Sequence, residues 1–140
     1  MKILLPVDGS EHSVRAARHV VNSVRGCNQS AILLLNVQPE IDAPEVRSHM
    51  RASEIEAMQE TRGGDALAPA RDVLDRAGLS YAPTVLIGPV AETIARFAAE
   101  QDCEKIVMGT RGLGAVAGVL MGSVTTRLLN LTTLPVTLVK

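Results

Sequence analysis

The chain has 140 residues, a length that predicts a single domain covering residues 1–140 with one good hydrophobic core. Hydrophobic residues make up 46% of it and the formal net charge is -1, which argues against disorder and gives no electrostatic reason to bind nucleic acid or an anionic membrane. With one Tyr, one Phe and no Trp, the chain also lacks the stacked rings on which single-stranded nucleic acids bind.

Five short apolar runs predict five β-strands. The runs are nearly continuous rather than alternating with polar residues, as expected for strands buried on both faces of a parallel sheet. In chain order they are Ile3–Val7, Ile32–Val37, Pro83–Ile87, Ile106–Met108 and Val136–Val139.

A helix is predicted between the first two strands, where valines and alanines recur at spacings of three and four residues. Asp8 and Glu11 have the spacing of a capping box at its start, and Ser10 is a second candidate N-cap. Gly26 is well placed to end this helix.

The connection between the second and third strands is harder to interpret. We expect a mobile segment over residues 38–48 and then helical structure as far as Ala77, with Gly78 as its stop. The Gly63-Gly64 pair is predicted to break or loosen the middle of this helix. Apolar spacing predicts two further helices, one before and one after the fourth strand, so the pattern is that of an open α/β sandwich with right-handed crossovers.

The carboxyl ends of three predicted strands supply a candidate ligand site. In a doubly wound sheet, ligands bind beyond these ends, at the point where the strand order reverses. Residues 6–10, 36–37 and 108–112 form the carboxyl ends of the first, second and fourth strands, so they line one crevice if these strands are near neighbours. The glycine-rich stretch 109–122 follows, and a helix begins after it. Glycines let backbone N–H groups approach an anion, and a helix start adds more donors, so this stretch predicts a phosphate site.

At these residues the chain resembles the ATP-binding branch of the universal stress protein family. The segments that carry the resemblance are ILLPVDGSE, LLNV, GPVAETIARFA and IVMGTRG, and the pattern Gly-x-x-Gly, nine residues, Gly-Ser is met by Gly109, Gly112, Gly122 and Ser123. The resemblance covers nearly the whole chain, although residues 38–80 match mainly in length and helical character. It implies a Rossmann-like, five-stranded parallel sheet in the order 3-2-1-4-5, with the reversal between strands one and four.

The resemblance also implies individual roles. Residues at the end of the first strand match the nucleoside contacts, Val37 matches the aliphatic wall against adenine, and the glycine loop with the following helix start matches the phosphate site. The implied ATP-binding residues are Pro6, Val7, Asp8, Val37, Met108, Gly109, Arg111, Gly112, Gly122, Ser123, Val124 and Thr125.

Several of these residues have a plain structural interpretation beside the functional one. Asp8 and Ser123 could be ordinary helix N-caps, and Gly112 could serve only a turn. Val37 could be ordinary core, and Arg111 could be a solvated surface residue. Arg127, one turn into the last helix, is a second and weaker candidate for a cation near the phosphates.

The chain offers no convincing catalytic base near the glycine loop. No His, Asp or Glu occurs between Lys105 and Lys140, and Asp8 is the only carboxylate that the motifs bring close. We therefore expect ATP binding that acts as a regulatory switch in a stress response, with at most slow hydrolysis and no catalytic residue assigned. Mg²⁺ would enter with ATP and be held mainly by phosphates, with Ser123 as the candidate protein ligand.

Two alternatives stay open. The chain could be a nucleotide-free, dimeric interaction module of the same fold, although its intact glycine motif argues against this. It could also be a weak ATPase or adenylate-handling enzyme, although the signatures His-Ile-Gly-His and Ser-Gly-Gly-x-Asp are both absent. The resemblance further implies a homodimer through the last strand, Val136–Val139, and the protein that would partner such a switch is unknown.

The cysteines and the N-terminus predict a cytoplasmic protein. Asp8 ends the first apolar run too early for a signal peptide, and the uncharged, glycine-containing run of residues 112–122 is far shorter than a membrane span. Cys27 and Cys103 are far apart and form no Cys-x-x-Cys motif, so we interpret both as buried, reduced thiols. The three histidines show no metal-ligand spacing.

Overall fold

The structure is a computed structural model and describes residues 1–110 and 121–140. Five strands form one sheet in the order β3-β2-β1-β4-β5, and every neighbouring pair is parallel, so the predicted topology is confirmed. The strands are β1 (Lys2–Pro6), β2 (Ala31–Gln38), β3 (Ala82–Ile87), β4 (Lys105–Gly109) and β5 (Val136–Val139).

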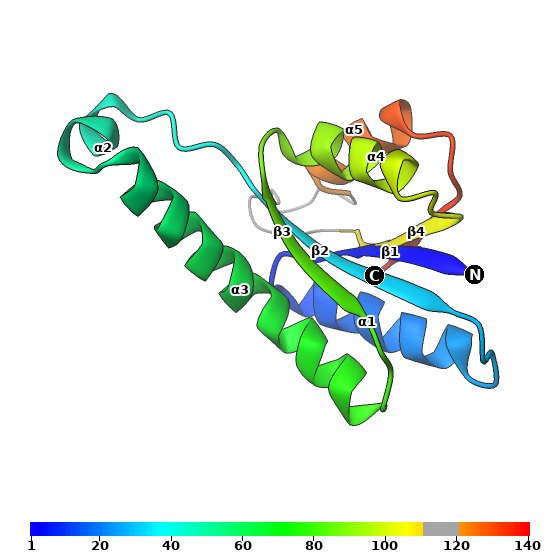
Figure 1. Cartoon of the computed structure of the whole chain (residues 1–140). Coiled ribbons are helices and arrows are strands. Elements are labelled where there is room, and N and C mark those ends of the chain that lie inside the picture. The colour runs from blue at the N-terminus through cyan, green and yellow to red at the C-terminus, as the bar shows by residue number, and fades with distance from the viewer. Residues whose placement is uncertain (111–120) are drawn as a thin grey trace.

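Helices cover both faces of the sheet. α1 and α3 lie on one side, and α4 and α5 lie on the other (Figure 1). The helices are α1 (Glu11–Val24), α2 (Pro44–His49), α3 (Ala52–Arg76), α4 (Val90–Glu100) and α5 (Ser123–Leu131). Within the described ranges, none of these helices has the length and apolar character that crossing a membrane requires.

The buried residues form two clusters, one on each face of the sheet. Neighbouring residues of a strand point to opposite faces, and β1 follows this rule: Ile3 and Leu5 pack with α1 and α3, whereas Leu4 packs with α4 and α5. Because both faces are covered, the central strands are apolar at nearly every position. This explains why the sequence shows continuous apolar runs instead of alternation.

The start of α1 differs from the predicted capping box. Ser10, not Asp8, is the N-cap, and its side chain accepts a hydrogen bond from the N–H of Ser13. Asp8 lies before the helix, and its carboxylate accepts hydrogen bonds from Ser10 and Ser13. Gly26, with φ of +83°, follows the C-cap as predicted.

The predicted break in the long helix is wrong. α3 continues from Ala52 to Arg76 through both Gly63 and Gly64. Gly63 is buried against β3, where a Cβ atom would stand 2.4 Å from Cγ1 of Val85, so this glycine permits close packing of helix on sheet. The segment expected to be a mobile connection contains α2, which has no buried residue and extends with the start of α3 beyond the sheet (Figure 1).

The two cysteines are in different environments, which corrects the expectation that both are buried. Cys27 is exposed after the end of α1, whereas Cys103 is buried, and both are free thiols. Burial raises the pKa of the Cys103 thiol, so it stays protonated and shielded.

We therefore expect one thiol of the folded protein to react rapidly with an aryl disulfide reagent at mildly alkaline pH, and the other to react only after unfolding in denaturant. Absorbance of the released thiolate measures both phases. Cys27→Ser should remove the rapid phase and leave the slow one. Equal reaction rates of the two thiols in the folded wild type would contradict this assignment.

Candidate functional site

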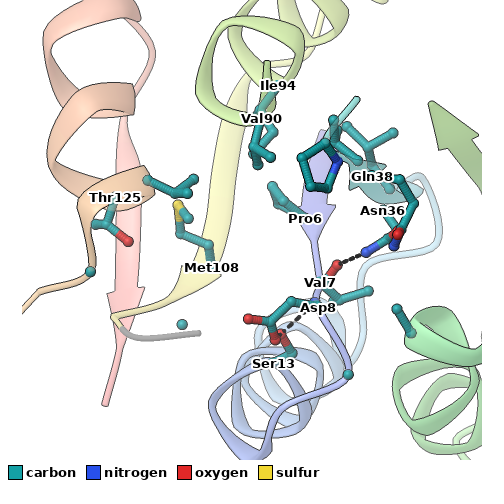
Figure 2. Close-up of a pocket in the computed structure, with 18 of the residues that line it drawn as sticks. Pro6, Val7, Asp8, Ser13, Asn36, Gln38, Val90, Ile94, Met108 and Thr125 are labelled. Carbon is teal, nitrogen blue, oxygen red and sulfur yellow. Dashed lines mark hydrogen bonds between the residues drawn. The ribbon is translucent and has the colours of Figure 1, made fainter. Parts of the chain in front are cut away.

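A pocket of about 640 Å³ lies at the carboxyl edge of the sheet, beyond the ends of β1, β2 and β4 (Figure 2). Its volume is within the usual range for small-molecule sites. β1 lies between β2 and β4, so the pocket is at the point where the strand order reverses. This is the position at which the sequence predicted a crevice.

The pocket gathers every predicted site residue that the structure describes. Arg111 and Gly112 lie outside the described residues. The predicted residues that line the pocket are Pro6, Val7, Asp8, Val37, Met108, Gly109, Gly122, Ser123, Val124 and Thr125. Their proximity is a fact of the fold, and their binding roles stay predictions.

Sequence reasoning missed another part of the wall. These residues come from α1, from β2 and its end, and from α3 and α4. They are Ser13, Leu35, Gln38, Pro39, Arg62, Asp65, Ala66, Val90 and Ile94, whereas Gly9 and Asn36, which also line the pocket, belong to the strand ends that the sequence placed in the crevice. Those next to predicted residues could have been found by extending each strand end by one or two positions. The α3 residues had no such signal, because their place depends on the packing of that helix against the β1–α1 turn.

The contact between α3 and this turn is close. Gly9 has φ of +86°, a left-handed conformation that favours glycine, and a Cβ atom on it would lie 3.3 Å from Cα of Ala66. Gln59 adds a second link, because its buried side chain donates to the carbonyl oxygen of Pro39 at 2.8 Å. One stretch of α3 therefore contacts both the turn after β1 and the segment after β2.

The apolar part of the wall comes from both faces of the sheet. Val7 packs into the cluster under α1 and α3, whereas Val37 and Met108 pack into the cluster under α4 and α5. Val90 and Ile94 of α4 also line the pocket (Figure 2). A flat apolar group could therefore meet aliphatic side chains from either side of the sheet edge, which suits a chain almost without aromatic residues.

The carboxylate of Asp8 is held in place by the turn after β1. Its Oδ1 accepts hydrogen bonds from the N–H of Ser10 at 2.9 Å and from Oγ of Ser13 at 2.8 Å. The backbone N–H of Asp8 in turn donates to Oγ of Ser13 at 3.0 Å. Figure 2 shows Asp8 and Ser13 joined at the pocket wall. These bonds fix the position of an acceptor group at the end of β1.

The start of α5 supplies donors to the same pocket. Gly122 is its N-cap and provides no capping side chain, and the first helical hydrogen bond runs from Thr126 to the carbonyl oxygen of Gly122 at 3.1 Å. The N–H groups of the first helical turn, residues 123–125, therefore have no acceptor within the helix. Such a terminus is well suited to an anion. The N–H of Gly122 also donates to the backbone carbonyl oxygen of Thr110 at 2.8 Å. This bond joins the start of α5 to the end of β4.

Few charged side chains of the described residues line the pocket. They are the cation Arg62 and the acids Asp8 and Asp65. Arg127, the weaker cation candidate from the sequence, pairs with Glu92 of α4 and does not line the pocket. The pKa of Glu92 is lowered, first by the carboxylate's hydrogen bond to its own backbone N–H and second by Arg127.

The comparisons with known proteins agree with this fold. The sequence model of the universal stress protein family matches residues 1–140. A universal stress protein of Methanocaldococcus jannaschii is 31% identical over 141 residues, which cover 99% of this chain and 81% of that protein.

Two solved structures share the fold. A universal stress protein of Lactobacillus plantarum superposes with a TM-score of 0.82 at 19% identity, over 100% of this chain and 97% of that one. A family protein of Arabidopsis thaliana, solved with AMP bound, has a TM-score of 0.70 at 20% identity, over 100% of this chain and 91% of that one.

Proposed function

This chain belongs to the universal stress protein family, and we propose that it is a member of the ATP-binding branch that acts as a nucleotide-dependent regulatory module. The observation that carries the proposal is one pocket that combines an aliphatic wall with the start of α5. An adenine nucleotide needs both: an apolar slot for its base and backbone donors for its phosphates. The AMP-bound protein of the same fold supports this choice of ligand.

In this proposal, the base lies beyond the ends of β1 and β2, against Val7 and Val37. The ribose hydroxyls lie near Asp8, whose carboxylate can accept their hydrogen bonds. Phosphates then extend along Gly109 toward the first turn of α5. This order follows the pocket from its most apolar wall to the part that is richest in N–H donors.

The charges of the pocket favour a nucleotide bound with Mg²⁺. Arg62 is the one cation that the described lining contains, and Asp8 and Asp65 offset it. Side chains of the described wall therefore cannot neutralise a triphosphate. We propose that Mg²⁺ arrives with ATP, held by phosphates and by the hydroxyl of Ser123, and that Arg111 and Gly112 complete the phosphate site.

We propose a binding role with at most slow hydrolysis. The described wall offers two carboxylates, and Asp8 is already engaged by Ser10 and Ser13. An efficient phosphoryl-transfer site positions the attacking water with a dedicated group. We further propose a cytoplasmic homodimer that pairs through β5, because this apolar strand lies at the edge of the sheet and, among the described strands, pairs with β4 alone.

Calorimetric titration of nucleotide-stripped protein with Mg-ATP tests the proposal. We expect saturable binding by the wild type and at least about tenfold weaker binding by Gly122→Val, because a branched side chain would obstruct the approach of phosphate to the helix start. The control is Gly64→Ala, at a position of α3 where a Cβ atom meets nothing within 4 Å, and it should bind like the wild type.

Circular dichroism would establish that both variants are folded. Absence of ATP binding by the wild type would refute the proposal and favour the nucleotide-free interaction module. Unchanged affinity in folded Gly122→Val would refute the assignment of the phosphate site to the start of α5.

A further inference from the structure

α5 carries a single charged side chain, that of Arg127. No Asp or Glu follows Glu104 in the sequence, so an acidic partner for this arginine has to come from an earlier element. It comes from α4, where Glu92 lies in the first turn and forms an ion pair with the Arg127 guanidinium. The two helices lie side by side (Figure 1), and Val90 of α4 and Ser123 of α5 both line the pocket. The ion pair therefore joins two helices that both form the pocket wall.

Arg127 begins one helical turn beyond the proposed phosphate site. Ser123 and Arg127 are four residues apart, so they share a face of α5 and are separated by about 6 Å along its axis. Side chains of an α-helix lean toward its N-terminus, so the long side chain of Arg127 can extend over its own helix toward Ser123. Ser123 lines the pocket, whereas Arg127, paired with Glu92, does not.

The guanidinium is able to change partners. The side chains of Arg127 and Glu92 are 66% and 36% exposed, so neither is locked in place by packing. An exposed ion pair contributes little free energy, because water screens both charges. A triphosphate offers more charge and more acceptor oxygens than one carboxylate, and a guanidinium binds phosphate oxygens well. The described lining of the pocket has Arg62 as its one cation, so a second cation would matter to a triphosphate.

We propose that Glu92 and the distal phosphates of the nucleotide compete for Arg127, and that this competition lets the site distinguish a triphosphate from a monophosphate. When ATP binds, the guanidinium turns from Glu92 to the phosphates at the start of α5. The single phosphate of AMP lies nearer Gly109 and leaves the ion pair intact. This inference rests on the proposed function and adds the means by which the length of the phosphate chain is recognised.

Calorimetric titration with Mg-ATP and with AMP tests the competition in the wild type, Arg127→Gln and Glu92→Gln. We expect Arg127→Gln to bind ATP at least about threefold more weakly, because it loses a phosphate ligand. Glu92→Gln keeps the length of the side chain and removes the competing charge, so it should bind ATP about two- to fivefold more tightly. Neither variant should change the affinity for AMP, which also shows that both are folded.

The double variant separates competition from simple repulsion. Glu92→Gln should lose most of its gain in ATP affinity when Gln also replaces Arg127, because no guanidinium is left to release. An equal gain with and without Arg127 would overturn the inference, since Glu92 would then act only by repelling phosphate. Equal weakening of ATP and AMP binding by either single variant would also overturn it, because the pair would then serve only to hold α4 and α5 together.

Arg96 and Glu100 provide the matched control. They form an exposed ion pair at the other end of α4, and neither lines the pocket. Arg96→Gln and Glu100→Gln change the same charges, so both nucleotides should bind as they do to the wild type. ATP affinities that follow net charge in these variants too would overturn the inference, as would a wild-type ATP affinity in every variant, and both results leave the proposed function standing. A wild type that binds neither nucleotide would overturn both.

Discussion

Replacing Gly63 with alanine is expected to lower the free energy of unfolding by about 1–2 kcal/mol, although alanine is the better helix former. The added Cβ atom would stand 2.4 Å from Cγ1 and 2.8 Å from Cγ2 of Val85, so rotating the valine cannot clear both contacts. Either α3 or β3 must move. Equilibrium unfolding in urea, followed by circular dichroism, measures the change.

The next residue provides the matched control. A Cβ atom on Gly64 meets nothing within 4 Å, so Gly64→Ala should gain about 0.5–1 kcal/mol from helix propensity alone. The same substitution at two adjacent positions of one helix is therefore expected to change the free energy of unfolding in opposite directions. Val85→Ala should recover part of the loss when combined with Gly63→Ala. If both glycine variants were more stable than the wild type, close packing of α3 on β3 would not be the reason for Gly63.

Replacing Gly109 with alanine is expected to be still more destabilising, by about 2–3 kcal/mol. Here the added Cβ atom would meet His12 at 2.7 Å from its Cβ and 2.9 Å from its carbonyl carbon. Backbone atoms cannot swing aside, so relief requires moving the first turn of α1 away from the end of β4. Urea unfolding again measures the loss, with Gly64→Ala as the reference for an alanine that meets no neighbour.

The same variant separates two explanations of the glycine motif. If Gly109 serves helix packing, the loss of stability appears without any nucleotide present. A Gly109→Ala protein as stable as the wild type, but weaker in ATP binding, would instead assign this glycine to the ligand alone. We expect the first outcome, because the contact with His12 exists in the protein by itself.

The sheet could be predicted because its signal is local. Strands covered on both faces need apolar residues at nearly every position, and the runs at 3–7, 32–37 and 106–108 show this directly. The order of the strands came from the family resemblance, and the structure confirms it. The course of α3 could not be predicted in the same way. Gly63 weakens a helix by intrinsic propensity, and the reason for its presence is a contact with a strand more than twenty residues away.

The pocket residues also fall into those that a local signal predicts and those that depend on tertiary packing. Residues at strand ends were predicted because the edge of a parallel sheet collects them whatever the details of packing. Arg62 and Asp65 were missed because they reach the pocket only through the contact of α3 with Gly9. Arg127 follows the glycine motif closely enough in sequence to be a candidate cation for phosphate, but its guanidinium forms an ion pair with Glu92 on the neighbouring helix. Partners of long, charged side chains depend on tertiary neighbours that a single sequence does not reveal.

The central position of β1 has a consequence for how the protein is made. β1 can pair with β2 as soon as residues 31–35 follow it, but its other neighbour, β4, begins only at Lys105. The start of α5 is completed later still, near residue 125. During synthesis, the first hundred residues therefore have one edge of β1 exposed and lack the start of α5, where the proposed function places the phosphates. In the proposed function, a nucleotide stabilises the finished chain but cannot guide the folding of its first two thirds, which must remain competent to add β4 without that help.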